Sequence, residues 1–290
     1  MNTTVIASSL TVPRWEGGEG EKVATAIVGR SYTSRPMSLG LEAPLPVLGG
    51  SRAAIDGLRL ADFSWQPDVP SLLESAIRSA ETGRMNFGAV LLEGEAGAGR
   101  THLARRLSHL AGLPHVLLDL GAPDGMQQLW QSRRGPDLVL PSAPVLAMAA
   151  ARCANPVISV TGIEQLGADA QGHLARMIDP HEAVAWRDHA AGGTVDLSQV
   201  SWMIQSHVPG LLSPRLAALL RPVRLRWPSD DDLPLHAVEV AAEAAIDENA
   251  STLSGHLVER IIGETRCRNR ERSTAALYQR TSAMIREALR

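Results

Sequence analysis

The chain has 290 residues, of which 44% are hydrophobic and 20% charged, a balance typical of a globular protein rather than a disordered one. Its formal net charge of −3 disfavours a general nucleic-acid binder, and no apolar run approaches the roughly 20 residues needed to cross a bilayer, so no membrane partner is expected. Lys22 is the only lysine among 28 basic residues, so chemistry that needs a lysine side chain has almost no candidate.

The cysteines and the N-terminal residues indicate the compartment. Cys153 and Cys267 lie far apart and neither belongs to a CxxC motif, which excludes a disulfide framework and a cysteine-based metal site. No basic residue precedes the weak apolar run at the N-terminus, so a secretory signal is not indicated. We therefore expect a cytoplasmic protein.

The first 60 residues differ from the rest of the chain. They are rich in Gly, Ser, Pro and Thr and show no sustained period, so residues 1–60 are predicted to form a flexible leader. From about Pro70 the apolar residues follow a helical spacing, and an apolar strand is predicted over 89–92. The folded part is therefore expected to begin near residue 61.

Two further regions follow along the chain. Between residues 61 and 228, apolar runs alternate with helical segments, which predicts an α/β domain with a parallel sheet covered by helices; the runs cover 89–92, 116–118, 157–160, 202–204 and 223–227. Beyond Trp227 only helical patterns remain, so residues 229–290 are predicted to form a small α-helical domain.

A glycine-rich turn lies between the 89–92 strand and the helix that follows it. Its sequence, GEAGAGRT over 94–101, fits the phosphate-binding pattern GxxxxG-[basic]-T, in which backbone amides surround the phosphates and a Thr hydroxyl reaches Mg²⁺. The candidate nucleotide-binding residues are Gly94, Glu95, Ala96, Gly97, Ala98, Gly99, Arg100 and Thr101. Arg100 stands where the pattern has lysine and offers a planar fork instead of a point charge. Either ATP binds here, or the turn binds nothing.

At this point the sequence resembles the AAA+ module of the Lon protease family, over about 72–289. The most specific stretch, residues 178–200, is similar without gaps to the family segment LDPEQNxxFxDHYLxxxxDLSxV, and the shared residues are Asp179, Pro180, Asp188, His189, Asp196, Leu197 and Ser198. Asn155-Pro156 and Leu120-Gly121 also match. The resemblance implies a P-loop NTPase core with a parallel sheet flanked by helices, followed by a small α-helical lid.

The same resemblance shows what is missing. The acidic D-E-I-D motif falls on 161–164, so the Mg²⁺-holding Asp and the water-activating Glu are absent and Glu164 takes only the later acidic position. The phosphate-sensing Asn is replaced at His207, and the arginine finger falls on Ala218-Leu219, which leaves Arg221 displaced nearby. Glu164, His207 and Arg221 are the remaining catalytic candidates. Thr101 would be the metal ligand if Mg²⁺ were bound, and Mg²⁺ is not expected.

Two further family positions are altered or ambiguous. The aromatic residue of the family's pore loop falls on Pro136. The lid arginine that contacts nucleotide falls on Arg270 or Arg272, within an arginine run over 266–272. That run has two other interpretations: a solvated helix connection balanced by nearby glutamates, or a contact with nucleic-acid phosphates.

These observations predict a degenerate AAA+ protein that retains the ATPase part only, without a protease domain. We expect a pseudo-ATPase, with ATP binding left open, that acts as a regulatory or structural subunit on a protein partner such as another AAA+ subunit. One alternative is an active ATPase or protein remodeller that uses Arg100 in place of lysine. A second is a nucleic-acid-associated AAA+ factor.

Overall fold

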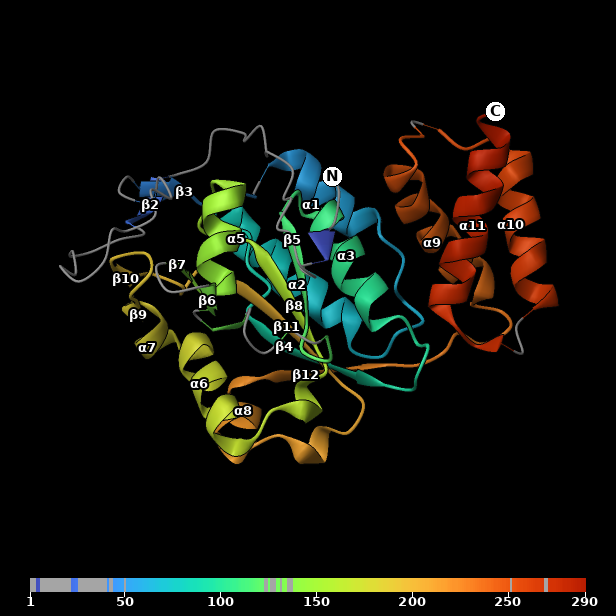
Figure 1. The fold of residues 1–290 in the computed structure, drawn as a ribbon. Helices are drawn as coiled ribbons and strands as arrows, with labels where there is room; N and C mark the ends of the chain where they lie inside the picture. The colour runs from blue at the N-terminus through green and yellow to red at the C-terminus, as the bar shows by residue number, and fades with distance from the viewer. Residues whose placement is uncertain are drawn as a thin grey trace.

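The fold is that of a computed structural model of the chain (Figure 1). The residues that it describes are 4–5, 22–25, 41, 44–49, 51–122, 125, 129–130, 132–134, 138–250, 252–268 and 271–290. Most of the expected leader lies outside these ranges, as do two positions singled out in the sequence, Pro136 and Arg270. An α/β part comes first along the chain, and three helices follow it.

The α/β part is built on a six-stranded sheet in which every neighbouring pair is parallel. In spatial order its strands are β1 (Thr4–Val5), β5 (His115–Asp119), β8 (Val157–Thr161), β11 (Ser201–Ser206), β4 (Ala89–Gly94) and β12 (Arg221–Leu225). All six residues of β11 are buried, because helices cover both faces of the sheet. The predicted α/β class is confirmed.

The strand order brings three loops together. β11 lies between β4 and β8, with Gln205 opposite Leu92 and Ile204 opposite Val160. Because the strands are parallel, the loops that leave the carboxyl ends of β4, β8 and β11 meet at one edge of the sheet. The glycine-rich turn, residues 162–166 and His207 are therefore neighbours, although more than 100 residues separate Arg100 from His207.

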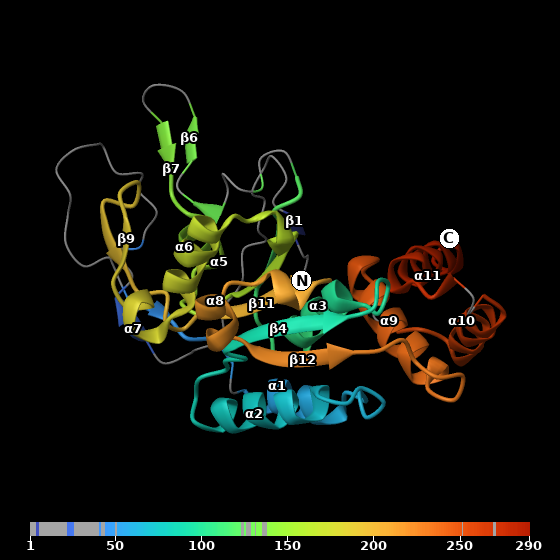
Figure 2. The same ribbon diagram turned by 90° about the horizontal axis from the view of Figure 1, so that it is seen from below.

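Helices cover the two faces of the sheet. One face carries α1 (Arg52–Leu60), α2 (Val69–Glu81) and α3 (Arg100–Leu110), whose buried residues form one core cluster. The other carries α5 (Ala143–Ala151), α6 (Ala168–Ile178), α7 (Pro180–Ala183) and α8 (Pro214–Leu219), which contribute to a second cluster. Figure 2 shows α1 and α2 on the opposite side of the sheet from α5, α6 and α8.

Short elements complete the α/β part. In the described part of the chain, three two-stranded antiparallel sheets lie outside the main sheet. They pair β2 (Lys22–Thr25) with β3 (Pro44–Pro46), β6 (Ser132–Arg134) with β7 (Leu138–Leu140), and β9 (Trp186–Asp188) with β10 (Gly193–Val195). Two 3₁₀ turns, Ile163–Gln165 and Pro209–Leu211, follow β8 and β11.

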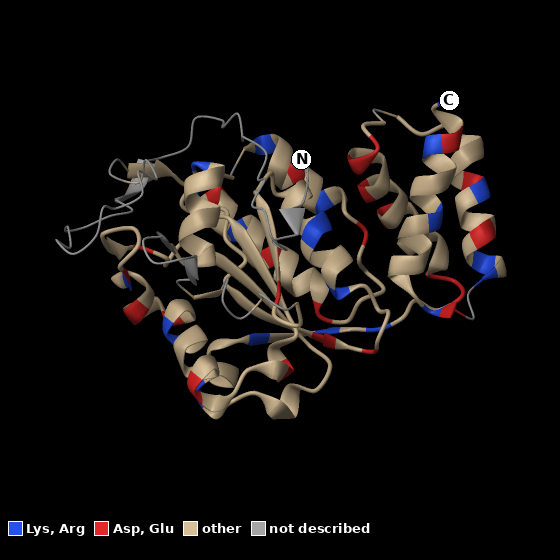
Figure 3. Ribbon diagram, in the orientation of Figure 1, with Lys and Arg blue, Asp and Glu red and all other residues tan. Residues whose placement is uncertain are grey.

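The last three helices form the predicted small helical domain. They are α9 (Leu233–Asp247), α10 (Gly255–Cys267) and α11 (Thr274–Ala288), and they bury a core of their own. Ser254 and Ser273 cap α10 and α11, since their hydroxyls accept from the amides of Leu257 and Ala276. Both signs of charge occur along these helices (Figure 3). Among the described residues, no helix combines the length and apolarity needed to cross a membrane.

The structure differs from the predicted leader at residues 52–60. These residues form α1, which begins at the cap Ser51 and packs on α2 and α3. Ala54 and Leu58, one helical turn apart, are 7% and 0% exposed. The sequence pattern missed α1 because a nine-residue helix carries too few apolar positions to show a period by itself. The folded part therefore starts before residue 61.

Two substitutions on α1 test whether this helix is part of the folded protein. Leu58→Ala removes a fully buried side chain and should lower the free energy of unfolding by about 2–5 kcal/mol, because a cavity is left in the core. Leu60→Ala, at a side chain that is 83% exposed, should change it by less than about 0.5 kcal/mol. Urea denaturation of both variants provides the measurement. Equal, small effects would show that α1 is not packed on the core.

Candidate functional site

The glycine-rich turn forms a loop between β4 and α3, as predicted. Gly99 precedes α3 with a φ of 90°, and no side chain caps the helix. The amides of the first helical turn therefore face the loop without intrahelical partners, which is the arrangement that binds phosphate. Glu95 and Ala96 are exposed at the tip of the loop, whereas Ala98 is buried in the core cluster beneath it.

A pocket of about 460 Å³ adjoins this loop. It brings together residues from the loop, from two strand ends and from the helical domain: Gly97, Gly99, Arg100, Thr101, Thr161, Gln205, His207, Glu243, Thr274 and Tyr278. Its volume lies within the range of small-molecule sites. Several of the nucleotide-binding candidates therefore share one cavity with His207. Arg221 lies elsewhere.

Arg100 is directed across the loop toward the end of β11. One terminal nitrogen donates to the Gly94 carbonyl at 2.5 Å and lies 3.4 Å from the Ser206 carbonyl, and the other lies 2.7 Å from Nδ1 of His207. Burial lowers the pKa of the guanidinium, and the nearby Glu164 carboxylate acts in the opposite direction. The planar guanidinium of Arg100 thus connects the phosphate loop to the end of β11. A lysine ammonium, which is a single point charge, would make this set of contacts less readily.

The hydroxyls where a metal would be expected are engaged with protein groups. Thr101 Oγ1 donates to Gln205 Oε1 at 2.9 Å, and Thr161 Oγ1 lies 3.2 Å from Asp119 Oδ1. Among the described residues, no group of three or more His, Cys, Asp or Glu side chains could hold a metal ion. Mg²⁺ prefers carboxylate and phosphate oxygens, and the acid lining the described part of this pocket, Glu243, is paired with Arg105 instead. The lining residues that the structure describes therefore offer no unpaired carboxylate to Mg²⁺.

Glu164 supports the end of β11. Its Oε1 accepts from the Ser206 hydroxyl at 2.8 Å and from the His207 amide at 2.6 Å. Burial raises the pKa of this carboxyl, but the hydrogen bonds from backbone amides and from Ser206 outweigh it and leave the pKa below its ordinary value. A carboxylate held ionised in this way is a weak general base, so Glu164 positions the loop.

The position of the missing water-activating Glu is shaped for glycine. Gly162 has a φ of 71°, in the left-handed region that other residues rarely adopt. A Cβ at this position would lie 2.8 Å from the Gly121 amide nitrogen. A larger residue here would require the backbone after β8 to move.

The helical domain touches the phosphate loop directly. The Gly97 carbonyl accepts from the Thr274 amide at 3.0 Å and from the Thr274 hydroxyl at 2.8 Å, and His236 Nε2 lies 3.1 Å from the same hydroxyl. A Cβ on Gly97 would lie 2.1 Å from the Arg272 carbonyl oxygen. Of the two lid arginines left open by the sequence, Arg272 therefore has its backbone at the loop and its side chain exposed, and Arg270 lies outside the described residues.

Buried ion pairs connect the same two parts of the chain. Glu243 lies between His102 and Arg105, 2.7 Å from Arg105 Nε, while Arg105 also contacts Asp247, and Arg106 Nε lies 2.6 Å from Glu239. Burial would lower the pKa of Arg105, but Glu243 and Asp247 raise it above its ordinary value. The sequence pattern did not lead us to these pairs. Their signal was the spacing of Glu239, Glu243 and Asp247, four residues apart on one face of α9.

Arg221 lies outside this pocket. It opens β12, and four residues further on Leu225 pairs with Gly94, so Arg221 lies about 13 Å along the strand from the phosphate loop. Its guanidinium donates to the Ser71 hydroxyl at 2.5 Å, and the residue is exposed. Arg221 therefore cannot serve the pocket of its own chain.

Comparison with known proteins gives the class and the family likeness. A closed-state cryo-EM structure of Hsp104 with ATPγS and FITC casein matches with a TM-score of 0.59 and 13% identity, over 79% of this chain and 46% of that one. The chain thus shares the fold of that protein: a parallel sheet flanked by helices and followed by a small helical domain. No protein-family model matches the chain.

Curated proteins of similar sequence are Lon proteases. The Lon protease of Frankia alni is 26% identical over 216 residues, covering 70% of this chain and 25% of the relative; that of Escherichia coli K12 is 23% identical over 273 residues, covering 92% and 35%. The chain is similar to the AAA+ module of Lon proteases, which confirms the resemblance noted from the sequence. The chain spans about a quarter to a third of the length of these relatives.

The buried pair at Glu243 gives a testable prediction. Glu243→Gln keeps the shape but removes the charge that Arg105 faces, and should lower the free energy of unfolding by about 3–5 kcal/mol, because it removes one partner of a buried ion pair. Glu259→Gln, on the exposed face of α10, should change it by less than about 0.5 kcal/mol. Equal effects in urea denaturation would show that the two domains are not joined through Glu243.

His236 makes the contact between lid and loop sensitive to acid. Burial lowers the pKa of His236 to about 3, whereas the unfolded chain has a pKa of about 6.5. The unfolded state therefore binds the proton first, and stability is complete above about pH 6.5 and is lost as the pH falls toward 3. His236→Gln should reduce this slope by up to about 1.4 kcal/mol per pH unit.

Unfolding free energies between about pH 7 and pH 4 check this expectation. His256→Gln, at an exposed position on α10, is the matched control and should leave the wild-type slope unchanged. His115, which burial also shifts to a pKa of about 3, should contribute a slope of the same sign in every variant. An unchanged slope in His236→Gln would contradict the prediction.

Proposed function

We propose that this Lon-like AAA+ module binds a nucleotide at the 94–101 loop without hydrolysing it and acts as a regulatory or structural subunit on a protein partner. The observation that carries the proposal is Gly162. The position of the family's water-activating Glu has a left-handed φ of 71° and a Cβ position 2.8 Å from a backbone nitrogen. The backbone conformation at residue 162 therefore disfavours a glutamate, so restoring that Glu would also require the backbone to move.

The phosphate loop supports nucleotide binding. The uncapped first turn of α3 presents amides to the pocket, and Arg100 adds a positive charge at its floor. The residues that would hold the phosphates of ATP are Gly97, Gly99, Arg100 and Thr101. Bound ATP would supply phosphate oxygens to these groups, and the protein would contribute binding and position only.

The active-enzyme alternative depends on Arg100. The guanidinium does reach the pocket, but it bonds the Gly94 carbonyl and approaches His207, and the lining residues that the structure describes offer no unpaired carboxylate to Mg²⁺. The nucleic-acid alternative depends on the 266–272 run, where Arg268 lies 3.4 Å from Glu264 and 3.8 Å from Glu271. Local pairing of this kind reduces the charge available to phosphates. Both alternatives therefore have weaker support.

The subunit role rests on surfaces outside the pocket. Arg221 is exposed at the opposite end of β12, where it can approach a neighbouring molecule but not its own loop. A symmetric assembly places such a residue against the site of the next subunit. We propose another AAA+ chain as the partner and the cytoplasm as the compartment.

Calorimetric titration with ATP, with and without Mg²⁺, followed by assay of the same sample for ADP, tests the proposal. We expect binding whose affinity changes by less than about twofold with Mg²⁺, and no ADP, because the described residues of the site offer no carboxylate free to bind the metal and activate water. Mg²⁺-dependent binding with ADP release would favour the active enzyme. Titrations without heat and without a shift in melting temperature would remove nucleotide binding from the proposal.

Two glycine variants show where the nucleotide binds. Gly97→Ala introduces a Cβ that meets the backbone of Arg272 in the lid. Gly88→Ala is the matched control: the φ of Gly88 is 72°, close to the 85° of Gly97, but its Cβ would have nothing within 4 Å. We expect ATP affinity to fall at least about tenfold in Gly97→Ala and to stay within about twofold in Gly88→Ala. Equal affinities would place ATP away from the loop.

A further inference from the structure

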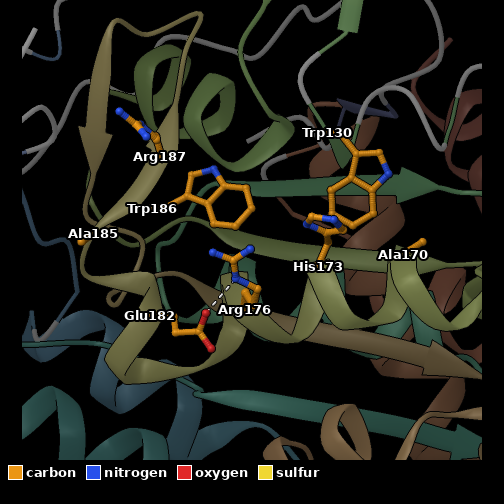
Figure 4. Close-up of a pocket in the computed structure, with 8 residues that line it drawn as sticks. All are labelled: Trp130, Ala170, His173, Arg176, Glu182, Ala185, Trp186 and Arg187. Atoms are coloured by element: carbon orange, nitrogen blue, oxygen red, sulfur yellow. Dashed lines mark hydrogen bonds and ion pairs between the residues drawn. The ribbon is translucent and has the colours of Figure 1, made fainter. Parts of the chain in front are cut away.

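A second pocket lies on the α6 side of the sheet, away from the phosphate loop. Its volume is about 570 Å³, and two indoles, those of Trp130 and Trp186, stand on either side of it (Figure 4). Ala170, His173 and Arg176, spaced three residues apart on α6, form the floor between them. The proposed nucleotide site shares none of these residues, so the two pockets are distinct.

The walls of this pocket are aromatic in a chain with few aromatic residues. Only 3% of the residues are Phe, Trp or Tyr. Trp130 and Trp186 are half-buried and pack against the core cluster on this face of the sheet, and the Trp130 and His173 rings meet edge to face with centroids 5.6 Å apart. Rings that are anchored on one side and open on the other favour a planar apolar group between them.

The polar groups of the pocket are mainly donors. Arg176 uses Nε to donate to Glu182 Oε2 at 2.7 Å, and its two terminal nitrogens find no acceptor among the described residues. The guanidinium is directed toward Trp186 in Figure 4. The other Glu182 oxygen accepts from Arg215, and Trp186 Nε1 is buried with no acceptor in the described part of the chain. The Arg176 side chain is 51% exposed, so its terminal nitrogens are open to a ligand that supplies acceptors.

The charges of Arg176 and Glu182 favour a carboxylate over a phosphate. Arg176 is oriented by Glu182, so its free edge presents two parallel N–H donors that match a carboxylate. Glu182 itself stays close to that edge, and its negative charge would repel a phosphate dianion more strongly than a carboxylate monoanion. The volume accommodates one aromatic ring and its acid group together.

We propose that this pocket binds an aromatic carboxylate, with the ring between Trp130 and Trp186 and the carboxylate on the terminal nitrogens of Arg176. Both a free aromatic acid and the C-terminal aromatic residue of a peptide offer this chemistry. The ring supplies apolar contact, and the carboxylate supplies the acceptors that the described residues of the pocket do not provide.

Calorimetry with N-acetylphenylalanine and N-acetylphenylalaninamide tests the assignment, because the two probes differ only in the carboxylate. The full chain should bind the acid about tenfold or more tightly than the amide, since a bidentate charged hydrogen bond is lost in the amide. In Arg176→Gln the two affinities should come within about twofold of each other. Equal binding of acid and amide by the wild-type chain, or binding of neither, would overturn the proposal.

Controls separate the pocket from general charge and from loss of folding. Arg260→Gln removes a guanidinium that makes a matching exposed pair with Glu287 at 2.8 Å and should keep the wild-type preference for the acid. Arg176→Gln and Arg260→Gln should both keep the wild-type melting temperature, because both side chains are about half exposed. An equal loss of preference in Arg260→Gln would overturn the role of Arg176.

Two further probes identify the source of the ligand. A short peptide ending in Phe with a free carboxylate should bind in competition with N-acetylphenylalanine, and its amidated form should not. Tighter binding of the peptide would identify a chain end as the ligand, and equal binding would identify a free acid; either supports the proposal. Phenyl phosphate binding more tightly than the carboxylate would contradict it.

Discussion

The contact between the start of α11 and the phosphate loop organises much of this molecule. Gly97 accepts both the amide and the hydroxyl of Thr274, and the loop has no space for a side chain at that point. His236 supports the same hydroxyl from α9 and, being buried, stays neutral. The ion pairs from α3 to α9 then hold the helix that begins at the loop against the domain that covers it. Loop, helix and lid therefore behave as one packed unit.

Within this unit, side chains at and around the phosphate loop bond to other groups of the protein. Arg100 bonds the carbonyl of Gly94 and approaches the end of β11, and Glu164 fixes that end from the other side. Thr101 is bonded to Gln205. Each interaction stabilises the closed arrangement of the strand ends. Together they leave a pocket with positive charge and backbone amides, whose one acid among the described lining residues is already paired.

The tryptophans occupy three different environments in the described structure. Trp202 is in the core, whereas Trp65 and Trp227 pack edge to face on His236 beneath the lid, and Trp130 and Trp186 form the walls of the second pocket. The core is otherwise mostly aliphatic. Among the described tryptophans, Trp130 and Trp186 line a cavity of ligand size.

Features that depend on local pattern could be predicted from the amino-acid order alone. Apolar runs and glycine spacing predicted the parallel sheet and the 94–101 loop, because burial on both faces of a strand and the geometry of a phosphate loop are encoded in consecutive residues. The aligned segment at 178–200 identified the Lon-like module, and the replaced residues at 161–164 predicted a degenerate site. The short helix α1 escaped the same method because nine residues show little period.

The roles of the site residues depend instead on how the chain packs. Arg100 and His207 are 107 residues apart, and Gly97 and Thr274 are 177 apart, so no local pattern indicates that they touch. The strand order places β11 between β4 and β8 and thereby turns Glu164 into an acceptor for backbone amides. The second pocket likewise combines Trp130, α6 and β9, and it exists only once the chain has folded. The amino-acid sequence determines which chemical groups are available, whereas the tertiary structure determines which of them come into contact.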